Sequence, residues 1–105
     1  MDADTFEFDS ELWEWDGKAA WHFFSVPEDV TDEVDATYGG RAAGFGSIKV
    51  EVTIGATTWQ TSMFPDTKRG CFILPVKAAV RRAEDLADGS VAHLRLRVRT
   101  EDLPA

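Results

Sequence analysis

The fold class is decided by residues 48–64, which read IKVEVTIGATTWQTSMF. The first seven residues alternate apolar and polar side chains, and this period of two is typical of a half-buried β-strand. Gly55 and Ala56 then supply a short turn, and the residues after them alternate again, with Trp59, Thr61 and Met63 on one face. The stretch therefore predicts a β-hairpin that buries one of its faces.

Other strands are expected on both sides of this hairpin, at residues 5–15, 20–26, 71–74 and 90–100. The first of them places phenylalanines on one face and acidic side chains on the other. The last places leucine and valine on one face and arginines on the other. Many short alternating strands separated by turn residues predict a mainly β domain.

Two short helices are expected, and each comes after a strand. One begins at Pro27 and is stopped by Gly39 and Gly40, and the other is opened by Pro75 and covers residues 76–85. The order strand, proline, helix, glycine turn and strand thus occurs twice. This repetition predicts a pseudo-symmetric domain of two interlocked half-barrels, which would protect the edges of the sheet.

Length and composition are those of an ordinary globular domain, with 105 residues, 44% hydrophobic and 29% charged. We expect a single domain over residues 1–105, with the barrel at 5–99 and frayed ends at 1–4 and 101–105. A lone cysteine, Cys71, cannot form an internal disulfide. No signal peptide and no apolar run of about 20 residues is visible, so a cytoplasmic location is expected.

The chain carries a formal net charge of −8. Such a charge repels phosphate backbones and anionic membrane surfaces, so neither nucleic acid nor a membrane is the expected partner. Arg95, Arg97 and Arg99 form a basic stripe, which cross-strand pairing with the acidic stripe Glu7, Asp9 and Glu11 would neutralise. A nucleic-acid footprint is the alternative interpretation of the arginines.

No catalytic constellation is visible, and no metal or cofactor is expected. Ser62 lacks the glycines of a nucleophile elbow. His22, His93 and Cys71 do not have the spacing of zinc ligands.

A ligand-binding site is a more specific hypothesis than a catalytic site for this sequence. Lys77 and Arg81 lie four residues apart on one helix face, and Arg side chains bind carboxylates or phosphates and stack on rings. If this face borders Trp21 and Trp59, a cation-lined aromatic pocket for an anionic ligand results. The candidate ligand-binding residues are Trp21, His22, Trp59, Ser62, Lys77 and Arg81. A solvated helix face beside a core Trp59 is the alternative.

Several motifs carry a resemblance that runs from about Phe6 to Val98. They are WEWDGK at 13–18, WHF at 21–23, GFGS at 44–47, VTIG at 52–55, WQTSMFPD at 59–66 and LPVKAAVR at 74–81. In these the chain resembles an uncharacterised bacterial domain-of-unknown-function family, some of whose members look fused to a YdeI or OmpD-associated type of domain. The resemblance implies a double-split β-barrel and no agreed activity.

The second half also resembles the swapped-hairpin module of AbrB-like and MazE-like DNA-binding regulators, which build one barrel from two chains. Here both halves lie in one chain, which favours a monomer. Fold alone does not carry function over.

Three functions stay open from the sequence. The first is a non-enzymatic binding or accessory module for a small anionic ligand or a partner protein. The second is a DNA-binding regulator, by analogy with the AbrB-like barrel. The third is an enzyme whose site forms only in three dimensions, such as His22 with Glu14 or Asp16.

Overall fold

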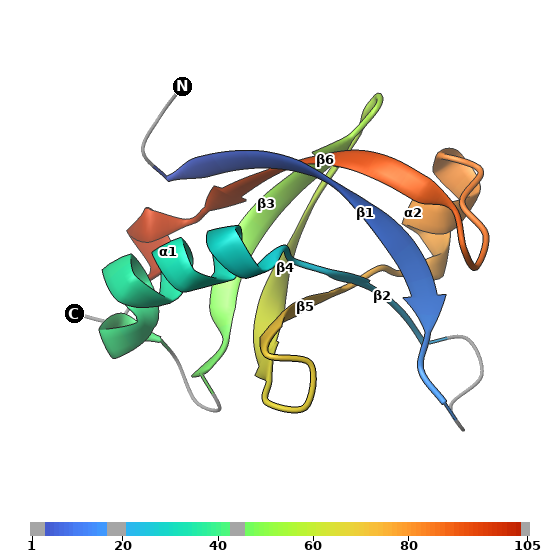
Figure 1. Ribbon diagram of the computed structural model, residues 1–105. Helices are drawn as coiled ribbons and strands as arrows, with labels where there is room; N and C mark the ends of the chain where they lie inside the picture. The colour runs from blue at the N-terminus through green and yellow to red at the C-terminus, as the bar shows by residue number, and fades with distance from the viewer. Residues whose placement is uncertain (1–3, 17–20, 43–45, 104–105) are drawn as a thin grey trace.

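Six antiparallel strands form a closed barrel in the computed structural model, which describes residues 4–16, 21–42 and 46–103 (Figure 1). The strands are β1 (Thr5–Glu14), β2 (His22–Ser25), β3 (Ile48–Ile54), β4 (Thr57–Asp66), β5 (Cys71–Pro75) and β6 (Val91–Val98). Around the barrel they follow the order β1-β2-β5-β4-β3-β6. The two helices are α1 (Glu28–Tyr38) and α2 (Ala78–Ala83). The prediction of a mainly β fold with two short helices is confirmed.

Some predicted features fall partly outside the described residues, namely the turn at Asp16–Gly17, the loop at Gly44–Ser47 and the two chain ends. Near the C-terminal end, the structure describes a turn of 3-10 helix, η3 (Thr100–Asp102). A second such turn, η1 (Gly39–Arg41), follows α1.

The core depends on β6, which pairs with β1 along one edge and with β3 along the other. Its inward side chains Leu94, Leu96 and Val98 are completely buried. They pack in one cluster with the inward residues of the other strands and with Val34 of α1. The alternation expected for residues 90–100 is therefore correct, because each second side chain enters this cluster.

The two longest strands change partners along their length. β4 pairs with β3 over residues 57–63 and, on its other edge, with β5 only over residues 64–66. β1 behaves in the same way: it pairs with β6 over residues 5–11 and with β2 only over residues 12–14. The barrel therefore opens where β4 leaves β5 and where β1 leaves β2.

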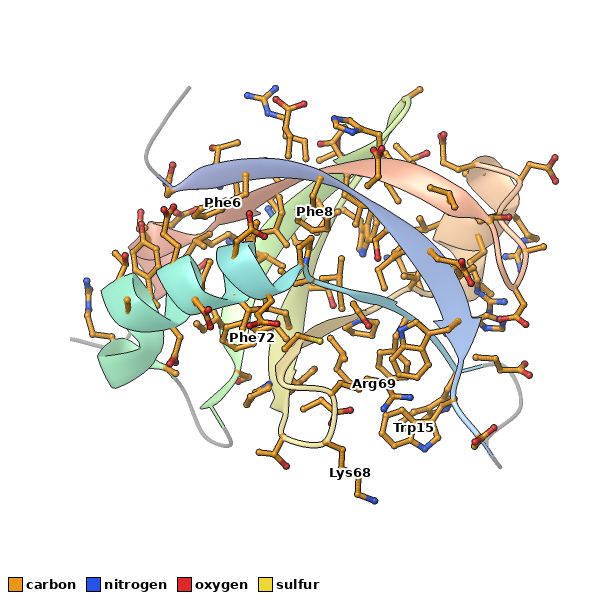
Figure 2. All side chains as sticks on the ribbon, in the orientation of Figure 1. Phe6, Phe8, Trp15, Lys68, Arg69 and Phe72 are labelled. Atoms are coloured by element: carbon orange, nitrogen blue, oxygen red, sulfur yellow. The ribbon has the colours of Figure 1, made fainter. Side chains whose placement is uncertain are left out.

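Helix α1 covers the opening beside β1. The Thr31 hydroxyl donates to the Val26 carbonyl oxygen (3.2 Å) and accepts from the Phe72 N–H (3.1 Å), which fixes the helix to β5. Figure 2 shows Phe6 and Phe8 on one side of α1 and Phe72 on the other.

Helix α2 is shorter than the predicted span of 76–85. It ends at Ala83 because Asp85 has a positive φ of 53°, which the helix cannot continue through. The Leu86 N–H donates to the Arg81 carbonyl oxygen (2.8 Å) across this end. Val80 is its buried residue.

Leu96 is completely buried on the strand that pairs with both β1 and β3. Truncating it to alanine should therefore lower the free energy of unfolding by about 2–5 kcal/mol. The neighbouring exposed residue supplies a matched control, since Arg95→Ala should change it by no more than about 0.5 kcal/mol. Urea denaturation followed by tryptophan fluorescence measures both. Equal losses for the two variants would contradict the inward placement of Leu96.

Candidate functional site

A pocket of about 300 Å³ lies at the opening where β4 leaves β5. Three segments line it: residues 21–23 at the start of β2, residues 59–61 of β4, and residues 75–77, which connect β5 to α2. The position follows from the pairing, because β5 pairs with β4 over residues 71–73 and with β2 over residues 73–75. Its volume is at the lower end of the range for small-ligand sites.

Four of the six predicted site residues line this pocket: Trp21, His22, Trp59 and Lys77. The remaining two, Ser62 and Arg81, are not among its lining residues. Ser62 lines a neighbouring depression with Lys49 and Arg99, which shares Gln60 and Thr61 with this pocket. Arg81 is half-buried in α2.

Two ring nitrogens in the pocket walls are buried without a hydrogen-bond partner among the described residues: Trp59 Nε1 and His22 Nδ1. Trp59 is 7% exposed, and the His22 side chain is 10% exposed. A buried polar group without a partner costs about 1–3 kcal/mol. The walls thus contain hydrogen-bonding capacity that the protein itself does not use.

The other nitrogen of His22 faces a carboxylate. Nε2 lies 3.8 Å from Glu14 Oε2, across the β1–β2 pair that sets these two residues opposite each other. The sequence analysis gave His22 with Glu14 as one example of an enzyme site that would form only in three dimensions. The two side chains do lie next to each other. At this separation they form an ion pair when the imidazole is charged, rather than a direct hydrogen bond.

A second aromatic group, next to the pocket, was not found from the sequence. Trp13 stacks on Phe23 with ring centroids 5.1 Å apart, and the Arg69 guanidinium lies 3.9 Å from the Trp13 ring centroid. Figure 2 shows Arg69 beside Trp15, whose ring centroid is 5.5 Å away. The spacing of Trp13 and Trp15 places both on one strand face, but only the strand order brings Arg69 to them.

Asp66 fixes this arginine. Its carboxylate accepts from Arg69 Nη1 at 2.9 Å and from the backbone N–H groups of Lys68 and Arg69. Desolvation opposes ionisation, but these hydrogen bonds together outweigh it and hold the pKa of Asp66 below its ordinary value. Arg69 is thus already paired and stacked, which makes it a support for the tryptophans rather than a free ligand-binding cation.

The charged stripes pair differently from the prediction. Glu7 does lie opposite Arg95, but its carboxylate contacts His93 Nε2 (2.9 Å), and Asp9 contacts His93 Nδ1 (2.7 Å). The sequence interpretation paired the acids with arginines only, whereas His93 lies on the same outward face and contacts both acids.

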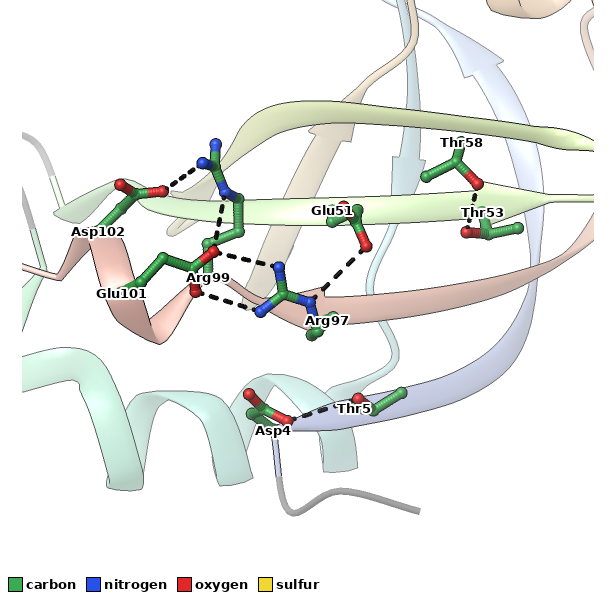
Figure 3. Close-up of polar contacts among 9 residues, drawn as sticks. All are labelled: Asp4, Thr5, Glu51, Thr53, Thr58, Arg97, Arg99, Glu101 and Asp102. Carbon is green, nitrogen blue, oxygen red and sulfur yellow. Dashed lines mark hydrogen bonds and ion pairs between the residues drawn. The ribbon is translucent and has the colours of Figure 1, made fainter.

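Two of the three arginines are neutralised from elsewhere (Figure 3). Arg97 donates to both carboxylate oxygens of Glu101, each at 3.2 Å, and Arg99 lies 2.7 Å from Asp102. The hydrogen bond from Arg97 lowers the pKa of Glu101 to about 2, so the pair is charged at neutral pH. These contacts weaken the nucleic-acid interpretation of the stripe.

Comparison with protein-family models matches residues 8–96 to the domain of unknown function DUF1905. The chain belongs to the DUF1905 family. No curated protein matches it. Membership in DUF1905 supports the predicted resemblance to a domain-of-unknown-function family, and it assigns no chemistry to the pocket.

Within the described ranges of this DUF1905 chain, no three His, Cys, Asp or Glu side chains are grouped so that they could hold a metal ion. No helix there is long and apolar enough to cross a membrane.

His93 gives a pH-dependent prediction. Hydrogen bonds to Glu7 and Asp9 raise its pKa above the ordinary 6.5. The charged His93 therefore stabilises the folded state through these two contacts. This contribution is fully present below pH 6.5 and is lost as the pH rises through the raised pKa of the folded state. In an NMR titration, Asp9→Asn should lower the midpoint of His93. Glu11→Gln is the control, because Glu11 lies opposite Val91 and not opposite His93. This change should leave the titration midpoint of His93 unchanged. A midpoint at or below the ordinary value in the unchanged protein would contradict the pairing.

Proposed function

We propose that this DUF1905 domain is a non-enzymatic binding module whose pocket between β2, β4 and the start of α2 takes a small anionic ligand. The observation that carries the proposal is the pair of buried, unpartnered nitrogens, Trp59 Nε1 and His22 Nδ1, in the walls of a pocket that Lys77 also lines. An indole N–H only donates, and an ammonium group only donates. A ligand that accepts hydrogen bonds and carries negative charge satisfies all three groups.

His22 suits this role when its imidazole carries both protons. Nδ1 then donates into the pocket. Nε2 then faces Glu14 Oε2 at 3.8 Å, so the carboxylate balances the imidazolium charge. Glu14 acts in this proposal as a positioning residue, and not as the partner of a catalytic base.

The charge of the site favours a monoanion. Lys77 is the one residue of permanent positive charge among the described residues that line the pocket. Glu14 lies beside His22, and the whole chain has a formal net charge of −8. A doubly charged phosphate would meet more repulsion here than a carboxylate. Trp21, Phe23 and Val76 form an apolar part of the wall, so the carboxylate should be attached to an apolar group.

Ligand entry requires a side-chain movement, because neither unpartnered nitrogen reaches solvent. Trp21 is the rim residue best able to move, since it is 61% exposed. Its displacement would expose the nitrogens, and its ring could then cover the bound ligand.

We further propose that the barrel is a double-split barrel of two related halves, AbrB-like in architecture, working as a cytoplasmic monomer in a bacterium. Both long strands change partners in the same manner, and both helices follow a strand that ends near a proline, Pro27 or Pro75. A DNA-binding role is not included, because Arg97 and Arg99 are paired with acids.

The binding proposal is tested by NMR titration with benzoate and, separately, inorganic phosphate. Benzoate should shift the indole N–H signal of Trp59 and raise the melting temperature in proportion to occupancy. Phosphate should bind more weakly. Lys77→Gln should weaken benzoate binding about tenfold, the loss of one charge-assisted contact worth ~1.4 kcal/mol.

Lys68→Gln is the matched control, because it removes the same charge from an exposed position outside the pocket. It should leave the affinity unchanged. If benzoate and phosphate leave the Trp59, His22 and Lys77 signals unmoved, the binding proposal is wrong.

A further inference from the structure

The pocket has a wall of backbone as well as side chains. β3 and β4 are joined by two residues, Gly55 and Ala56, and Ile54 lies opposite Thr57 across this turn. Gly55 takes a φ of +56°, as the first position of such a hairpin loop requires. The two residues that flank a two-residue loop form a hydrogen-bonded pair, and bonded and non-bonded pairs then alternate along the strands.

This alternation determines which backbone groups of β4 are free. Trp59 and Thr61 form bonded pairs with Val52 and Val50 of β3, so their N–H and C=O groups point to β3. Gln60 lies opposite Glu51 in a non-bonded pair, so its N–H and C=O point to the other edge. The 2.9 Å contact between the Thr53 and Thr58 hydroxyls fits this register, because non-bonded pairs bring side chains closer.

No described strand pairs with that other edge at Gln60. β5 meets β4 only at residues 64–66, and Gln60 is one of the residues that line the pocket. A free edge presents N–H and C=O groups to which an extended chain can pair. The pocket therefore combines an open strand edge with the donors of Trp59, His22 and Lys77.

The corresponding opening in this molecule, where β1 leaves β2, is filled by a helix. There the eleven-residue helix α1 covers the space, with Val34 completely buried in the core. The helix beside β4, α2, has six residues and buries Val80. The short helix leaves the edge at Gln60 uncovered, so this opening is the one that can receive another chain.

We propose that the occupant of this opening is the carboxyl-terminal end of an extended peptide, which adds to the edge of β4 at Gln60 while its terminal carboxylate binds Trp59, His22 and Lys77. This inference rests on the proposed function and names the ligand class. An extended peptide end supplies in one molecule both things that the site offers to bind, a monoanionic carboxylate and backbone groups for a strand edge. Main-chain pairing gives affinity, and the apolar wall from Trp21, Phe23 and Val76 selects an apolar last side chain.

Three probes test the inference on the full chain by NMR: N-acetylated tetrapeptides of varied sequence with a free carboxyl terminus, the same peptides with an amidated terminus, and benzoate. Free-acid peptides that end in an apolar residue should bind at least tenfold more tightly than their amides. They should also slow hydrogen exchange of the Gln60 amide. The Trp59 and Thr61 amides, already bonded to β3, should be protected with and without peptide.

A proline substitution separates edge pairing from side-chain contact. Gln60→Pro removes an N–H that makes no bond to β3, so the β3–β4 pair should survive, and peptide binding should fall about tenfold. Gln60→Val keeps this N–H and should bind as the unchanged protein does. Benzoate binding should be unaffected in both variants. If Gln60→Pro does not fold, hydrogen exchange of the Gln60 amide in the unchanged protein, with and without peptide, decides whether the peptide pairs with this edge.

The outcomes distinguish this inference from the function on which it rests. If benzoate shifts the Trp59 signal but peptides do not bind, or bind without protecting the Gln60 amide, the peptide inference is overturned and the site takes small carboxylates. If amidated peptides bind as well as free acids, the role given to the carboxylate is wrong. If no probe shifts Trp59, both proposals fail.

Discussion

Closure of the barrel depends on two long strands that each divide their pairing between both edges. Seven residues of β4 pair with β3 along one edge, and three pair with β5 along the other. In the same way, seven residues of β1 pair with β6 and three pair with β2. A strand that paired fully on both edges would make a closed wall without openings. The divided pairing leaves two openings, and the main features of the molecule follow from how each one is filled.

One opening is filled by protein and the other is left as a pocket. Helix α1 is long enough to insert Val34 into the core and to bond Thr31 to the backbone on both sides. At the other opening the chain turns after Pro75 into a helix of six residues. The two unpartnered ring nitrogens and the unpaired edge of β4 at Gln60 belong to residues that line the same pocket. This shared position favours a ligand that satisfies both over one that binds side chains alone.

The period of the apolar residues was enough to predict all six strands and both helices within a few residues, because each strand buries one face in a single core. Four of the predicted site residues, Trp21, His22, Trp59 and Lys77, line one pocket, and their role as a binding site stays a prediction. Ser62, three residues after Trp59 on β4, is not among the residues that line this pocket. The place of Arg69 and the partners of His93 depend on strand order and register, which a sequence pattern does not fix. The length of α2 was overestimated because the positive φ of Asp85 is not marked by a glycine.

A crystal structure of the chain with a bound free-acid tetrapeptide tests the central claim most directly. The account predicts a carboxylate oxygen within about 2.7–3.2 Å of Trp59 Nε1, and the peptide backbone paired with Gln60 on the open edge of β4. A peptide bound at another surface, such as the stack of Trp13, Trp15 and Arg69, with the Trp59 nitrogen still unpartnered, would contradict it.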